Sequence, residues 1–206
     1  MPERVTTNDK AALHALLDAV PIGHFGFVEH SSPVVMPNAF VRDNDDILMH
    51  GSTGSWWLRK LSDGREVSAS VSILEGLVYA RSGFESSMQY KSAVLFGRCV
   101  PLKGVEKARA LDLVVDGLLP KRLSELRPAT KKELAATLLL KMRIDEWSFK
   151  SSIMWPEDPE EDIASDAWAG FLPIVSRYGD PENSPDLRPG IPLAASVARL
   201  RGSKTF

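Results

Sequence analysis

Residues 66–74 read EVSASVSIL and decide the fold class of this chain. Apolar side chains alternate there with glutamate and serine, and a period of two is typical of a strand that buries one face. The opposite face carries Ser68, Ser70 and Ser72. We therefore predict a strand whose polar face is solvated or binds something polar.

Short apolar runs separated by turn-forming residues predict further strands on both sides of this one. The predicted strands cover residues 22–29, 34–42, 47–50, 77–81, 92–100 and about 141–150. Glu75 and Gly76 are predicted to form a two-residue connection between neighbouring strands. Together these runs indicate six or seven antiparallel strands.

Helical periodicity predicts three helices, over residues 8–20, 105–119 and 130–139. Thr7 is expected to cap the first helix and Pro21 to end it, and a short helix is expected within residues 54–61. Because the strands between residues 22 and 101 have no other helical crossover, a parallel sheet is disfavoured. The chain is predicted to be mainly β (α+β), a closed or nearly closed antiparallel barrel with helices on its ends.

The length of 206 residues favours one core. Residues 156–166 are rich in acids and residues 179–192 are rich in proline, so both are expected to be irregular. We predict one domain over residues 1–175 and a Pro-rich C-terminal arm over residues 176–206 that lies on another surface.

Composition narrows the classes of partner and compartment. The 25 Lys and Arg residues nearly balance 27 Asp and Glu residues, for a net charge of -2, so we expect neither nucleic acid nor a membrane as partner. The single cysteine, Cys99, excludes an internal disulfide and is expected to be buried rather than nucleophilic. No apolar run is long enough to span a bilayer, and Met1–Lys10 has no export signal. These observations predict a cytoplasmic protein.

The stretch 50–55, HGSTGS, joins a predicted strand to a short helix. Glycines there would let a ligand approach the backbone, and hydroxyls and helical N–H groups would suit a phosphate. An ordinary helix-capping turn explains the same residues. His50 is either a donor to a ligand oxygen or a structural histidine, whereas His14, His24 and His30 have no neighbours at metal-binding spacing and are assigned no role.

Two further segments are candidates for contact with a ligand. Pro37 interrupts a strand, which predicts a bound ligand beside the backbone or a plain bulge, and Asn38 would offer its amide to a polar ring edge. Residues 86–92 form a wall for a flat polar cofactor or a solvated loop anchored by Tyr90. Trp168 is either a core or subunit-contact residue or a stacking partner.

The order of these motifs resembles the FMN-binding split-barrel family. The motifs are the first helix, residues 34–41 (VVMPNAFV), 47–52 (ILMHGS), the serine-rich strand, 88–98 (MQYKSAVLFGR) and 166–170 (DAWAG). The similarity covers about residues 5 to 175 and is closest to the branch related to pyridoxamine 5'-phosphate oxidase that includes the nitroimidazole-resistance flavoproteins. It implies a six- to seven-stranded antiparallel split β-barrel with flanking helices.

The resemblance also implies a homodimer that holds FMN in clefts between its subunits. It assigns three groups of residues to the cofactor: the isoalloxazine edge, the ribityl phosphate and the closure of the cleft. These groups are, in that order, Pro37, Asn38, Ala39 and Phe40; His50, Gly51, Ser52, Ser55 and Trp56; and Tyr90, Lys91 and Ser92. Trp168 is expected to reach the partner's flavin.

One departure from the family concerns charge. Many relatives have a basic residue in the turn where this chain has Trp56 and Trp57. Neutralisation of the phosphate is therefore expected to depend on Arg59, Lys60 or Lys91.

The implied activity is that of an FMN-dependent oxidoreductase that acts on a small planar acceptor, with a nicotinamide cofactor as electron source. No side chain is an obvious general acid or base. Two alternatives stay open: a non-catalytic flavin or haem binding or sensor protein on the same fold, and a dimeric interaction module without a cofactor.

Overall fold

The computed structural model describes residues 5–205, and its centre is one nine-stranded antiparallel sheet. The strands are β1 (Val5–Thr7), β2 (Ile22–Glu29), β3 (Ser32–Asp43), β4 (Asp46–Ser52), β5 (Glu66–Tyr79), β6 (Ser87–Pro101), β7 (Thr137–Arg143), β8 (Glu146–Ser152) and β9 (Gly170–Pro173). The helices are α1 (Lys10–Ala19), α2 (Trp56–Leu61), α3 (Gly104–Leu118), η1 (Leu123–Glu125), α4 (Lys131–Ala136), α5 (Glu160–Ile163) and α6 (Ala195–Leu200).

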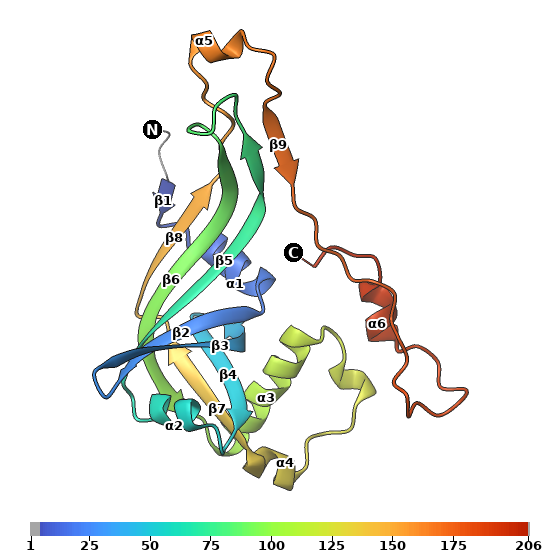
Figure 1. Ribbon diagram of the computed structural model, residues 1–206. Coiled ribbons are helices and arrows are strands. Elements are labelled where there is room, and N and C mark those ends of the chain that lie inside the picture. The colour runs from blue at the N-terminus through green and yellow to red at the C-terminus, as the bar shows by residue number, and fades with distance from the viewer. Residues whose placement is uncertain (1–4, 206) are drawn as a thin grey trace.

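Six strands close into a ring. The order β6-β7-β4-β3-β2-β5 returns to its start because β5 also pairs with β6. Strands β8 and β1 extend the sheet beyond β6, and β9 extends it beyond β5 (Figure 1). The predicted antiparallel barrel with flanking helices is thereby confirmed.

The interior of the ring is apolar, as the alternation in residues 66–74 requires. Val67, Ala69 and Val71 of β5 are at most 2% exposed, and Leu95 and Cys99 of β6 are fully buried beside them. Burial raises the pKa of the Cys99 thiol to about 12, which confirms that this cysteine is a core residue and not a thiolate nucleophile.

Helix α1 lies against the interior of the barrel. Its buried side chains Leu13, Leu16 and Leu17 belong to the main core. Thr7 was expected to cap this helix, but Thr7 lies in β1 and the cap is Asp9, whose carboxylate accepts a hydrogen bond from the Ala12 N–H at 3.0 Å.

Helix α3 covers one part of the sheet's outer face. Ala110 and Val114 of the helix pack with Leu48 of β4 and Leu139 of β7 in a separate cluster, with Val41 of β3 at its edge. Gly117 permits this close approach, because a Cβ there would lie 2.7 Å from the Val41 side chain.

The structure corrects four predictions about the elements. The turn expected at Glu75 and Gly76 is a bulge inside the continuous strand β5, so the hairpin turns after Tyr79 instead. Residues 87–91, expected in a loop before the strand over 92–100, belong to β6. The single strand expected over 141–150 is the pair β7 and β8, and the helix expected to reach residue 139 ends at Ala136, where β7 begins.

Beyond β9 the chain continues as an extended segment that includes α6, and its C-terminal end returns to the start of that segment (Figure 1), where the Thr205 N–H donates to the Ser176 carbonyl at 3.1 Å. The backbone N–H and hydroxyl of Ser196 in α6 donate to Glu125 of η1 at 2.9 and 2.6 Å, which fixes α6 to the body. The predicted division at residue 175 stays a prediction. Among residues 5–205, no helix is long and apolar enough to cross a membrane.

Candidate functional site

The outer face of the sheet is bare beyond the part that α3 covers. Its exposed apolar residues lie on β2, β3 and β6 and include Val28 and Val35, each 63% exposed, Ile22 at 53% and Phe96 at 47%. We call this surface the open face. Its members are Ile22, His24, Val28, Val35, Pro37, Ser70, Ser72, Ser92, Val94 and Phe96. An apolar surface of this kind marks a site for a ligand or another protein.

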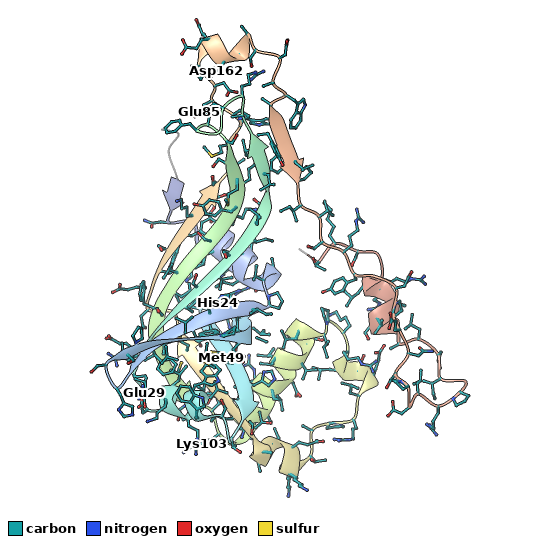
Figure 2. The ribbon with its side chains drawn as sticks, in the orientation of Figure 1. His24, Glu29, Met49, Glu85, Lys103 and Asp162 are labelled. Carbon is teal, nitrogen blue, oxygen red and sulfur yellow. The ribbon has the colours of Figure 1, made fainter. Side chains whose placement is uncertain are left out.

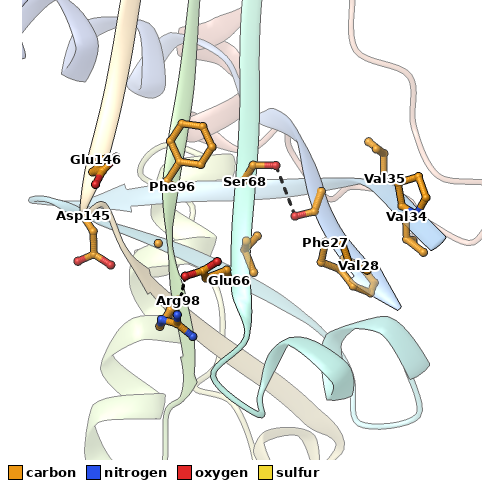
Figure 3. Close-up of a pocket in the computed structure, with 14 residues that line it drawn as sticks. Phe27, Val28, Val34, Val35, Glu66, Ser68, Phe96, Arg98, Asp145 and Glu146 are labelled. Carbon is orange, nitrogen blue, oxygen red and sulfur yellow. Dashed lines mark hydrogen bonds and ion pairs between the residues drawn. The ribbon is translucent and has the colours of Figure 1, made fainter. Parts of the chain in front are cut away.

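A pocket of about 640 Å³ lies at one end of the open face (Figure 3). Val28, Val35 and Phe96 supply apolar walls, while Arg98 pairs with Glu66 at 2.6 Å at its polar side. The pocket is therefore apolar in the middle and charged at the rim, as small-molecule sites generally are.

The segment 37–40 divides between the two faces of β3. Pro37 is exposed on the open face, whereas Phe40 is only 2% exposed and meets Phe25 edge-on in the core. The Asn38 amide donates to the carbonyls of Ala39 at 3.0 Å and His50 at 3.4 Å. Its N–H groups thus tie β3 to β4, and the side chain of Phe40 faces away from any ligand on the outside.

His50 lies on the outer side of β4, the side on which Leu48 contacts the α3 cluster. Its Nδ1 atom is buried and has no hydrogen-bond partner within residues 5–205. Burial lowers the pKa of His50, so the imidazole is neutral at pH 7. A buried polar atom without a partner indicates a place where a ligand can supply one.

Several polar groups of the turn after β4 form hydrogen bonds within the chain. The Ser52 hydroxyl accepts from the Gly54 N–H at 3.0 Å, and the Thr53 N–H donates to the Ala136 carbonyl at 3.0 Å. Ser55 begins α2 without a side-chain cap. The predicted role of this turn as a phosphate cradle therefore depends on the first N–H groups of α2 and on nearby cations.

Packing in the structure requires a glycine at position 51, which was not evident from the sequence. A Cβ at this position would lie 2.5 Å from Cδ1 of Leu58, a residue only 1% exposed. The glycine lets α2 pack closely against β4, whether or not a ligand also approaches it.

The three candidate cations differ in availability. Lys60 pairs with Glu29 and Lys91 pairs with Glu75, each at 2.6 Å. Lys60 and Arg65 together lower the pKa of Glu29 to about 2. Arg59 is exposed and makes no ion pair in the described part of the chain, so it is the cation available beside the turn.

The remaining predicted residues lie farther along the sheet. Tyr90 and Ser92 alternate with the inward Ala93 and so share the outer side of β6 with the open face. Lys91 points the other way, into a 250 Å³ pocket beneath α1 that Glu75 also lines. Lys150 of β8 stands 5.4 Å from the centre of the Tyr90 ring.

Two predicted tryptophans have aromatic neighbours. Trp56 is 48% exposed and lies 6.3 Å from Phe27, which also receives the Arg65 guanidinium. Trp168 is 67% exposed and lies 5.8 Å from Tyr79 at the far end of β5. The structure therefore separates the predicted residues into a cluster at β3, β4 and α2 and a second group along β5, β6 and β9.

His24, which was assigned no role from the sequence, is exposed on the open face. A signal for it was present, because the buried Phe25 and Phe27 alternate with His24 along β2 and so assign it to the outer side. Within residues 5–205 no cluster of three metal-binding side chains is present.

Residues 9–151 match the family model described as pyridoxamine 5'-phosphate oxidase. The chain belongs to this family. The match begins just before α1 and ends in β8, and therefore includes the whole six-stranded ring. The resemblance seen in the sequence is thereby confirmed. A comparison with curated proteins found no match.

Solved structures extend the similarity into the C-terminal segment. The chain is similar to the FAD and haem binding protein from Mycobacterium smegmatis, with 43% identity and a TM-score of 0.93 over 97% of this chain and 98% of that one. It is similar to the flavocytochrome Anf3 from Azotobacter vinelandii, with 34% identity and a TM-score of 0.86 over 96% and 92% of the two chains. A putative 5-nitroimidazole antibiotic resistance protein from Bacteroides thetaiotaomicron shares the fold, at 19% identity and a TM-score of 0.62 over 71% and 86%.

Proposed function

We propose that this protein binds a flavin and a haem and acts as a redox protein. The observation that carries the proposal is the open face, where apolar side chains stay exposed around a few polar groups. Two relatives that match nearly the whole chain support it, one a FAD and haem binding protein and the other a flavocytochrome. The second group, haem, belongs to one of the alternatives that the sequence left open.

The residues present suit a flavin. A flavin presents a polar ring edge and a phosphate, and the chain offers the unpartnered Nδ1 of His50 for the former and Arg59 for the latter. Ser70, Ser72 and Ser92 add hydroxyls on the same side of the sheet. The sequence resemblance implied FMN, whereas the name of the mycobacterial relative favours FAD, and we propose FAD.

The residues present also suit a haem, because apolar side chains surround the exposed imidazole of His24 on the open face. When bound, a flavin accepts two electrons as a hydride and a haem iron changes oxidation state by one electron. The protein's contribution is to hold both groups on a rigid sheet and to exclude water with its apolar side chains.

The visible spectrum of freshly purified full-length protein tests this proposal. We expect flavin bands together with a Soret band, and release of FAD rather than FMN on denaturation. If the protein is colourless, added FAD and haemin should each raise its melting temperature, since a ligand at about 100 times its dissociation constant stabilises by about 2.7 kcal/mol. Protein that is colourless and insensitive to both additions would overturn the proposal.

The oxidoreductase activity is a finer proposal that a second measurement tests. We expect anaerobic addition of a reduced nicotinamide cofactor to bleach the flavin bands, with a small planar molecule as acceptor. A flavin that stays oxidised under this donor and yet is reduced by dithionite would favour the non-catalytic alternative.

A homodimer is proposed on the same surface. The open face is apolar and continuous with the predicted flavin residues, and the family resemblance implies clefts between two copies. We expect sedimentation at about twice 22.7 kDa. Phe96→Asp, which places two charges in a symmetric contact, should shift the protein toward the monomer by at least about tenfold in dissociation constant. A wild-type monomer with bound cofactors would contradict this expectation.

A further inference from the structure

His24 stands in the middle of the open face among small side chains. It pairs with Pro37 on β3 and with Ser70 on β5, and Ser70 in turn pairs with Val94 on β6. Gly26 follows two residues later on the same side of β2. The imidazole is therefore larger than the side chains directly beside it, and Figure 2 labels its position on β2.

Larger apolar residues form a rim around the small side chains beside His24. Ile22 precedes His24 on the same side of β2, Val35 lies diagonally across on β3, and Val94 lies two strands away on β6. A flat apolar ring that covers two strand spacings, about 10 Å, can rest on these side chains with the imidazole beneath its centre.

The other three histidines lack such a setting. His14 Nε2 lies 3.2 Å from Asp45 Oδ1, and His30 is in a turn with Nε2 3.3 Å from Glu29. His50 pairs with Leu139, which is fully buried under α3, and it is followed by the close contact between Gly51 and Leu58. His50 is half-buried beside the α3 cluster, whereas His24 is exposed.

We propose that His24 is the axial ligand of the haem, held over Pro37 and Ser70 on the open face. This inference rests on the proposed function, since it assigns a residue to a group that the protein is proposed to bind. A neutral imidazole is a common protein ligand of haem iron, and it coordinates through a ring nitrogen lone pair. The apolar rim of Ile22, Val35 and Val94 then shields the side of the macrocycle that faces the sheet from water.

The test compares haem spectra of purified full-length variants. His24→Ala should lose the histidine–iron vibration in the resonance Raman spectrum and weaken haemin binding by at least about tenfold. Added imidazole should restore the wild-type Soret position, which a merely structural role would not produce. His14→Ala and His30→Ala are matched controls and should keep the wild-type haem spectrum. Flavin content of each variant reports on folding.

The outcomes separate this inference from the proposed function. If wild-type protein binds no haem, the proposed function fails in its haem part. If wild-type protein binds haem and His24→Ala retains the histidine–iron vibration, the assignment of His24 is wrong. Loss of that vibration in His50→Ala instead would show that the ligand is on β4, which also overturns the assignment.

Discussion

Two halves of the same sheet surface contrast in this protein. Over β4 and β7, Leu48 and Leu139 are buried by Ala110 and Val114 of α3. Over β2, β3 and β6, apolar side chains such as Val28 and Val35 stay 63% exposed. The contrast indicates that the exposed half, over β2, β3 and β6, is a surface for contact with another molecule.

The largest effect on stability is expected from a substitution in the half of the sheet that α3 covers. Leu139→Ala should destabilise the protein by about 2–5 kcal/mol, because it opens a cavity beneath α3. Val35→Ala on the open face should change stability by less than about 0.5 kcal/mol in cofactor-free protein made monomeric by Phe96→Asp. Chemical denaturation measures both. A large loss for Val35→Ala without cofactor would show that the two halves do not differ.

Gly51→Ala tests whether the glycine serves packing. The new Cβ would lie 2.5 Å from Cδ1 of the buried Leu58, so we expect a loss of about 1–3 kcal/mol in thermal or denaturant unfolding. Gly54→Ala is the matched control, since its nearest atom would be Ser52 Oγ at 3.4 Å. Equal stability of the two variants would leave ligand approach as the better explanation of Gly51.

Arg59→Gln addresses the cation beside the open half. We expect FAD affinity to fall by about tenfold, and the difference from wild type to shrink at high salt. Lys60→Gln is the matched control, because Lys60 is already paired with Glu29 at 2.6 Å. Flavin titration followed by fluorescence measures both affinities. Equal losses in the two variants would argue against a special role for Arg59.

The smallest effect concerns acid stability. Lys60 and Arg65 lower the pKa of Glu29 from 4.5 to about 2 in the folded protein. The stabilisation from this carboxylate is therefore complete above pH 4.5 and is lost as the pH falls toward 2. Glu29→Gln should flatten the decline of melting temperature across that window.

The control for that variant is Glu66→Gln, which removes a carboxylate from an exposed pair with Arg98. We expect its melting temperature to follow the wild-type pH profile. An unchanged profile for Glu29→Gln would mean that the cluster around Glu29 contributes nothing to acid stability.

Much of the fold was predictable because it depends on local periodicity. The alternation around Val67 and Val71 assigned the core face of β5 correctly, and the pattern of leucines in residues 8–20 gave α1. The break between β7 and β8 was missed, because its turn lies within a run that reads as one strand. The bulge at Glu75 was taken for a turn, since glycine suits both conformations.

The candidate site was less predictable, because a motif does not say which way a side chain points. Asn38 was expected to face a ring edge, yet its amide joins β3 to β4. Lys91 was grouped with Tyr90 and Ser92, but strand alternation turns it toward α1. The roles proposed for residues 37–40, 50–56 and 90–92 stay predictions until cofactor binding is measured.

The sequence by itself determined the strand alternation, the barrel class and the family, because each of these follows from the identity and order of neighbouring residues. Only the tertiary structure decided which half of the sheet α3 covers, and therefore that the outer side of β2 with His24 stays open. Those features depend on contacts between residues far apart in the chain, such as Leu48 with Val114. The neighbours of His24 on two other strands, Pro37 and Ser70, are a feature of the same kind.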